Sequence, residues 1–163
     1  YRKGNYLAKE TTIVTDAPIW IKETKYDFIA EDEINTHSSY PYGYPYGYSN
    51  NLGIRNIINE NFVGSDIVIN IYGPVINPTI FIRTHPYIVN TTILAGEYLT
   101  ISTKDKTIIK TKNNGEQVNE FHRRNKEYSV FQKIKPGSNI VSWDESFNFS
   151  IVLIEERSEP KWT

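Results

Sequence analysis

Apolar residues recur at every second position along most of the chain, with polar residues between them. In residues 66–72 the apolar side consists of Ile67, Ile69 and Ile71, and residues 147–154 carry a longer row of the same kind. Successive side chains of a strand point to opposite faces, so a period of two predicts strands that are buried on one side. No window of a dozen residues has the period of an α-helix.

The same alternation predicts a series of strands separated by short turns. Most apolar residues in these runs are β-branched or aromatic, as strands favour. The predicted strands are residues 66–72, 79–84, 97–103, 106–112, 117–122, 128–134, 139–143 and 147–154. Asn113-Asn114-Gly115-Glu116 and Lys135-Pro136-Gly137 are typical turn sequences between them. The pattern indicates an all-β fold, and we expect an antiparallel β-sandwich from about Asn50 to Ile154.

The first 49 residues differ from the rest of the chain. Residues 11–15, 18–23 and 26–30 predict short strands outside the main sandwich, and residues 31–39 form a polar stretch expected to be a loop. We therefore divide the chain into an N-terminal arm or connector, residues 1–49, and a β-sandwich domain, residues 50–163.

The arm ends in the sequence YPYGYPYGY, in which tyrosine alternates with proline and glycine. Proline and glycine disfavour a helix, so we expect an extended segment with all its rings on one face. Pro41 and Pro45 have no amide hydrogen to donate, so the segment can join a sheet along one edge only. It is either a linker that packs on its own domain or a strap that docks on a neighbour. Because tyrosine is enriched at interface anchors, the candidate interface residues are Tyr40, Tyr42, Tyr44, Tyr46 and Tyr48.

Composition narrows the possible partners. The 163 residues include 18 basic and 19 acidic residues, for a net charge of −1, and no basic stripe, so nucleic acid and anionic membrane are poor candidates. No apolar run reaches the roughly 18 residues of a spanning helix, and no signal peptide is visible. Cysteine is absent, which excludes disulfides and thiolate chemistry. Methionine is also absent, and we expect the chain to be a fragment of a longer protein.

The residues that could carry catalysis are scattered. His37, His85 and His122 lack the spacing of metal ligands, and we expect them to be ordinary surface or hydrogen-bonded histidines. The acidic pair Asp144-Glu145 follows a tryptophan, a weak glycosidase-like hint, but it is better explained as a polar turn. No nucleophile elbow, phosphate loop or dinucleotide fingerprint is present. We expect no enzyme activity, no cofactor and no metal.

Sugar binding is an open alternative. Exposed aromatic rings can stack on pyranose faces, and Tyr98 and Trp143 are the candidate platform, although Trp143 is better explained as packing at the edge of the sandwich. Asn90-Thr91-Thr92 and Asn148-Phe149-Ser150 fit the glycosylation sequon, the second within a predicted core strand; both are expected by chance in so asparagine-rich a chain.

The order of motifs resembles the C-terminal half of phage distal tail proteins, the siphovirus-type tail component family. The match begins with an aromatic strand and the tyrosine-proline segment, continues through several strand and turn motifs, and covers almost the whole chain. Its pieces are Pro18-Ile19-Trp20, residues 40–48, Ile71-Tyr72-Gly73-Pro74, Asn77-Pro78, Ala95-Gly96-Glu97 with the strand up to Thr103, and Ile134-Lys135-Pro136-Gly137-Ser138-Asn139.

This resemblance implies a galectin-like jelly-roll sandwich attached to an N-terminal ring-forming domain that the chain lacks. The full-length protein would form a hexameric ring in the virion, as a hub between the tail tube and the tip or tail-associated lysin, after expression in the bacterial cytoplasm. Some relatives carry sugar-binding insertions in this half, for which the short loops of this chain leave no obvious room. Besides assembly, the resemblance implies host-surface adhesion as a second role, with host cell-wall carbohydrate as the partner. The alternative to a structural tail component is a non-catalytic carbohydrate-binding β-sandwich.

Overall fold

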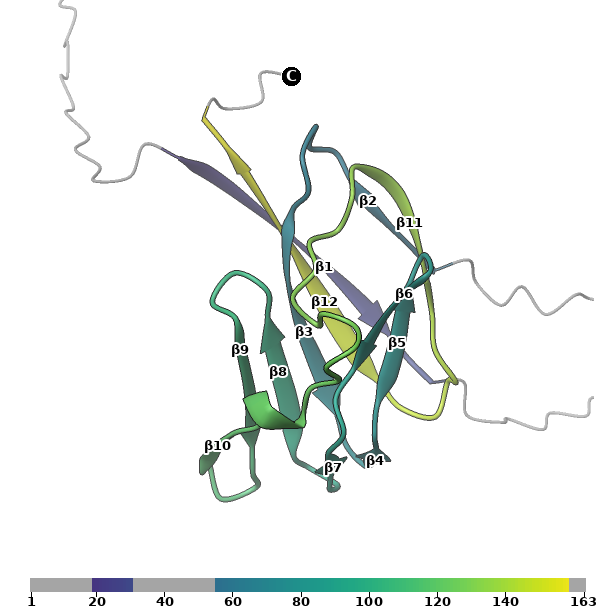
Figure 1. Ribbon diagram of the computed structural model, residues 1–163, viewed down its shortest axis with the longest axis vertical. Coiled ribbons are helices and arrows are strands. Elements are labelled where there is room, and N and C mark those ends of the chain that lie inside the picture. The colour runs from purple at the N-terminus through teal and green to yellow at the C-terminus, as the bar shows by residue number, and fades with distance from the viewer. Residues whose placement is uncertain (1–18, 31–54, 159–163) are drawn as a thin grey trace, which may run out of the picture.

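The computed structural model describes residues 19–30 and 55–158, which form an antiparallel β-sandwich (Figure 1). The strands are β1 (Trp20–Phe28), β2 (Arg55–Asn59), β3 (Asp66–Tyr72), β4 (Val75–Ile76), β5 (Thr79–Ile82), β6 (His85–Ile88), β7 (Thr92–Ile93), β8 (Tyr98–Ser102), β9 (Thr107–Thr111), β10 (Gln117–Asn119), β11 (Gly137–Ser142) and β12 (Phe149–Arg157). A single turn of 3₁₀ helix, η1 (Phe121–Arg123), follows β10.

The strands form two main sheets and a small one. The larger sheet has six strands in the order β1-β12-β3-β8-β9-β10, and the smaller has four in the order β2-β11-β5-β6. Strands β4 and β7 make a two-stranded ribbon at one end (Figure 1). Every strand pair is antiparallel.

The predicted period of two produces the core. Ile67, Ile69 and Ile71 of β3 are buried, as are the alternate residues of the strands beside it. The smaller sheet contributes the facing layer, and the residues that meet between the sheets include Ile57, Ile80, Ile82, Leu99, Ile101, Ile108, Val141, Phe149, Ile151 and Leu153. The strand positions inferred from alternation are therefore confirmed for most of residues 66–154.

The predicted turns also form. The Asn-Gly turn joins β9 to β10, where Gly115 has a φ of 83° and the Lys112 amide donates to the Glu116 carbonyl. Gly137 has a φ of 83° at the start of β11. Glycine adopts this left-handed backbone without the steric cost of a side chain. Asp144 accepts the Ser146 amide, so the acidic pair lies in a turn.

The separation of residues 18–23 and 26–30 from the sandwich was wrong. Residues 20–28 form the single strand β1, which pairs with β12 over its full length, from Trp20 opposite Arg157 to Phe28 opposite Phe149. Polar residues at Thr24 and Lys25 resembled a break between two strands. At the edge of a sheet both faces of a strand are largely open to water, so polar residues interrupt neither face.

The prediction of a strand at residues 128–134 was also wrong. This segment is irregular, and its one strand-like pairing is an isolated bridge between Ile134 and Ser65, the residue before β3. Its buried residues, Val130 and Ile134, are four positions apart rather than two. Asn125 accepts the amides of Glu127 and Tyr128, and such local side-chain bonds replace strand pairing with a turn. The strand predicted at 117–122 ends early for the same reason, since Asn119 accepts the Phe121 amide.

Several predictions lie outside the described residues. These are the strand at residues 11–15, the loop at 31–39, the tyrosine-rich segment at 40–48 and the domain boundary near residue 50.

Candidate functional site

The outer face of the larger sheet carries two tyrosines side by side. Tyr72 of β3 and Tyr98 of β8 are directly opposite each other in the register, and 41% and 39% of their surfaces are exposed. Residues opposite each other in an antiparallel pair share a face, so both rings lie on the side away from the core.

Several neutral polar side chains lie beside the two rings. In the next row of the register lie Asn70 and Thr100, whose hydroxyl donates to the Asn70 amide oxygen at 2.8 Å. Ser150, opposite Asn70 on the other side, lies 3.4 Å from the Tyr72 hydroxyl. Tyrosine faces beside hydroxyl and amide groups can stack on a sugar ring and hydrogen-bond its hydroxyls.

Trp143 does not share this face with Tyr98. Its ring packs edge-on against Phe28 and Phe149 at centroid distances of 5.7 and 5.0 Å, and its indole nitrogen donates to the Phe147 carbonyl. The guanidinium of Arg55 lies 4.5 Å above the ring. Trp143 is part of the aromatic packing at the edge of the core, and the structure does not join it with Tyr98 into one platform. Tyr72, which the sequence analysis did not select, is the neighbour of Tyr98.

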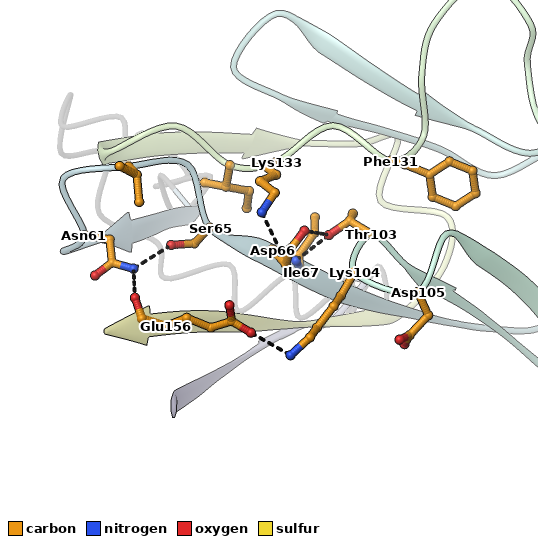
Figure 2. Close-up of polar contacts among 12 residues, drawn as sticks. Asn61, Ser65, Asp66, Ile67, Thr103, Lys104, Asp105, Phe131, Lys133 and Glu156 are labelled. Atoms are coloured by element: carbon orange, nitrogen blue, oxygen red, sulfur yellow. Dashed lines mark hydrogen bonds and ion pairs between the residues drawn. The ribbon is translucent and has the colours of Figure 1, made fainter. Parts of the chain in front are cut away.

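A second polar region lies where the β2–β3 connection meets the end of β8 (Figure 2). Asp66 accepts hydrogen bonds from the Thr103 hydroxyl at 2.9 Å and from the Lys133 ammonium at 2.8 Å. The Thr103 oxygen in turn accepts the Ile67 amide at 2.8 Å. Burial raises the pKa of Asp66, but the hydrogen bonds from Lys133 and Thr103 outweigh it and hold the pKa below its ordinary value. Asp66 is therefore a fixed carboxylate that ties Lys133 to the sheet.

The rest of this region is paired in the same way (Figure 2). Lys104 and Glu156 form an ion pair at 2.6 Å, and Asn61 donates to the Ser65 hydroxyl and to the Glu156 carbonyl. The cleft between these groups, lined by Asn61, Ser65, Asp66, Lys133 and Glu156 among others, has a volume of ≈ 170 Å³. Its charges neutralise one another, so it offers hydrogen bonds to a small polar molecule but no activated group.

A buried carboxylate lies at the same end of the sandwich. Glu155 is 1% exposed; its Oε1 accepts the Glu60 amide and lies 3.5 Å from Arg157, while its Oε2 lies 3.3 Å from the Lys22 ammonium. The Lys22 ammonium also meets Glu60 at 3.1 Å, and this contact is the largest cause of its raised pKa. The cluster joins β1, β2 and β12.

Another polar hollow, with a volume of ≈ 410 Å³, lies beside β9 and η1. Lys110 meets Glu120 at 3.1 Å and donates to the Thr92 carbonyl, and Arg123 approaches Glu120 at 3.7 Å. Asn90 of the first sequon lines this hollow and is exposed. Asn148 of the second sequon does not lie within a core strand; it precedes β12, is exposed, and accepts the Ala30 amide at 2.6 Å.

The described histidines do not converge. His85 Nε2 lies 2.8 Å from the Ser129 carbonyl, and His122 lies next to the Phe121 ring. Within residues 19–30 and 55–158, no group of three histidine, aspartate or glutamate side chains gathers to hold a metal ion. His37 and the five predicted interface tyrosines lie outside these ranges.

The described part of the chain contains no helix with the length and apolar character that a membrane crossing requires. No protein-family model, curated protein or solved structure matches the chain.

Proposed function

We propose that this chain is a structural module of a phage or prophage tail tip, the C-terminal sandwich of a distal tail protein, and not an enzyme. It serves assembly between the tail tube and the tip or tail-associated lysin, in a virion whose hub is a ring of the full-length protein. The sandwich is galectin-like in this proposal, as the resemblance implies.

The observation that supports the proposal is the position of the motifs on which the resemblance rests. Gly73-Pro74 lies between β3 and β4, Asn77-Pro78 between β4 and β5, and Gly96-Glu97 just before β8. Two of these joints are bonded to each other, because the Gly73 amide donates to the Glu97 carbonyl at 3.0 Å. A Cβ on Gly73 would lie 2.1 Å from the Leu94 carbonyl oxygen, so only glycine fits this contact. The motifs therefore act together as a scaffold, which is the role that an assembly protein needs.

The charged residues of the clefts support a structural role as well. Asp66, Glu120 and Glu155 are each held by a lysine or arginine at 3.3 Å or less in at least one contact. Carboxylates held in ion pairs of this kind connect neighbouring elements of the fold, which is a structural role.

Detection of the protein in purified particles tests this proposal. Antibodies against the chain, or mass spectrometry of tail fractions, should place it in virions released from the source organism, with gold label at the tail tip. Detection in the cell extract with none in particles would refute it. The gene neighbourhood gives an independent check, since genes for a tape measure and a tail lysin are expected on either side.

A carbohydrate-binding sandwich is the second candidate, and the Tyr72–Tyr98 pair favours it. If the outer face binds neutral cell-wall polysaccharide, Tyr72→Ala and Tyr98→Ala should each weaken retention on immobilised polysaccharide about tenfold, in line with roughly 1.4 kcal/mol for a lost stacking contact. Phe81→Ala is the matched control, because Phe81 is 40% exposed on the other sheet. A wild-type chain that is not retained, or an equal loss in the Phe81 variant, would rule this candidate out.

A further inference from the structure

Strand β1 forms one edge of the larger sheet. It pairs with β12 on one side, and no described strand pairs with its other side. In an antiparallel edge strand, alternate residues direct their amide and carbonyl groups away from the sheet. Nine residues of such an edge, Trp20–Phe28, are a ready template for a further strand.

The exposed half of this edge projects beyond the core. The last pair between β12 and β3 is Ile154 with Asp66, so Glu155, Glu156 and Arg157 pair with β1 alone. Figure 1 shows β1 and β12 continuing as a two-stranded ribbon past the other strands. Trp20 is 60% exposed on this ribbon.

Symmetry restricts how two copies of β1 could pair. A two-fold axis that pairs two copies of β1 antiparallel must be normal to the sheets, so the outer faces stay on one side. Each odd-numbered residue then lies opposite an odd-numbered residue of the partner. The outer face of β1 consists of Ile21, Glu23, Lys25 and Asp27, so the register decides which of these charges meet.

The register centred on Thr24 sets opposite charges against each other near its centre and keeps all nine residues of β1 in the pair, with Ile21 opposite the partner's Asp27. It sets Glu23 opposite the partner's Lys25 and, by symmetry, Lys25 opposite the partner's Glu23. A shift of two residues either way sets Glu23 opposite the partner's Glu23 or Lys25 opposite the partner's Lys25, which is unfavourable. A shift of four, centred on Tyr26, joins Lys25 to the partner's Asp27 but keeps only residues 24–28 of β1 in the pair.

We propose that β1 pairs antiparallel with β1 of a second copy, centred on Thr24, and joins two larger sheets into one. Charged residues on an edge normally prevent such pairing. Here they prevent the neighbouring registers and favour this one. Glu23 and Lys25 are both exposed. Lys25 meets Asp27 of its own strand at 2.7 Å, and in the dimer the partner's Glu23 would be a second carboxylate beside it. This dimer does not depend on the proposed function in a phage tail, because it requires only the β1 edge described above.

Charge reversal tests the register through oligomeric state. Glu23→Lys and Lys25→Glu each place like charges opposite each other twice in a homodimer, so each should raise the dimer Kd by at least about tenfold, measured by analytical ultracentrifugation. Mixing the two variants brings lysines of one copy opposite glutamates of the other, and a heterodimer should form. Glu127→Lys and Lys126→Glu, exposed charges in the irregular segment, are the matched controls and should leave the Kd unchanged.

A cross-link tests the centre of the pair. The chain has no cysteine, and opposite residues of an antiparallel pair have Cα atoms about 4.5–5.5 Å apart, within disulfide range. Thr24→Cys should therefore form a covalent dimer on mild oxidation, whereas Thr111→Cys, equally half-buried in an interior strand, should not. A wild-type chain that stays monomeric at its highest attainable concentration would overturn the proposal. Dimerisation that the charge variants leave unaltered, or a mixture that fails to associate, would equally overturn it.

Discussion

At the scale of single residues, isoleucine supplies much of the core. Ile69 is fully buried at the centre of the larger sheet, opposite Ile151 on one side and Ile101 on the other. Its branched side chain has few rotamers to lose in a strand and fills the pleated surface between these neighbours.

Truncation of the Ile69 side chain should therefore destabilise the fold. Ile69→Ala removes buried methyl groups and leaves a cavity, and we expect the free energy of unfolding to fall by about 2–5 kcal/mol in urea denaturation. Ile140→Ala is the control, since Ile140 is 56% exposed on β11 and its loss should change stability by less than about 0.5 kcal/mol. Equal effects of the two substitutions would contradict the assigned core.

The stability of the fold should depend on pH through Asp66. Its pKa in the folded protein lies below the ordinary value of 3.8, because its hydrogen bonds from Lys133 and Thr103 outweigh its burial. A carboxyl with a lowered folded pKa contributes stability above its unfolded pKa, and that contribution disappears as the pH falls through the folded value.

Thermal unfolding between neutral pH and pH values below 3.8 checks this dependence. The wild type should lose more stability on acidification than Asp66→Asn, which keeps the shape of the side chain but cannot titrate. Asp105→Asn, a change of the same kind at an exposed aspartate, should retain the wild-type dependence. A wild-type profile in Asp66→Asn would show that Asp66 is not the group responsible.

At the scale of elements, alternation predicts a strand well where one of its faces is buried. β3, β8 and β12 have this property, and their apolar positions were assigned to the correct face. β1 was divided because an edge strand has no strictly buried face to mark its continuity. The segment at residues 128–134 has a strand-like composition, yet two of its amides donate to nearby side chains, Tyr128 to Asn125 and Phe131 to Ser129. Such local hydrogen bonds compete with strand pairing, and composition does not reveal them.

The structural importance of β1 can be measured through Phe28. Its ring stacks on Phe149 at a centroid distance of 4.5 Å and is 3% exposed. Phe28→Ala should lower the free energy of unfolding by about 3–5 kcal/mol, as for other buried aromatic residues. Phe62→Ala, at a fully exposed position, should have little effect. If Phe28→Ala were as mild as Phe62→Ala, β1 would be an attached arm rather than part of the sandwich.

At the scale of the whole molecule, function is less predictable than fold because it depends on which faces come together. Tyr98 lies exposed on the outer face, but its partner Tyr72 ends a separate strand, and only the β3–β8 register brings the two rings together. Alternation gives the face of each residue and not its neighbour across the sheet. In residues 66–72 the odd-numbered isoleucines face the core, so the even-numbered Tyr72 is expected on the outer face. This alternation is the only feature of the sequence that indicates an exposed Tyr72.

The tyrosine-rich segment gives the last prediction, and it concerns assembly. Tyr40, Tyr42, Tyr44, Tyr46 and Tyr48 are proposed to contact a neighbouring domain or subunit, since aromatic rings provide contact area at low entropic cost. The alternative is that they pack on their own sandwich. The two hypotheses differ in what the rings stabilise, so a substitution that removes the rings and keeps the prolines and glycines separates them.

The triple variant Tyr42→Ser, Tyr44→Ser and Tyr46→Ser should keep the melting temperature of the chain within a few degrees while abolishing co-purification with tail proteins. A drop of more than roughly 10 °C would instead mean that the rings belong to the core, since each kcal/mol lost shifts the Tm of a domain this size by only a few degrees. Dimerisation through β1 provides an internal control: a folded triple variant should still form the β1 pair. Loss of tail binding with the dimer intact would then be specific to the tyrosines.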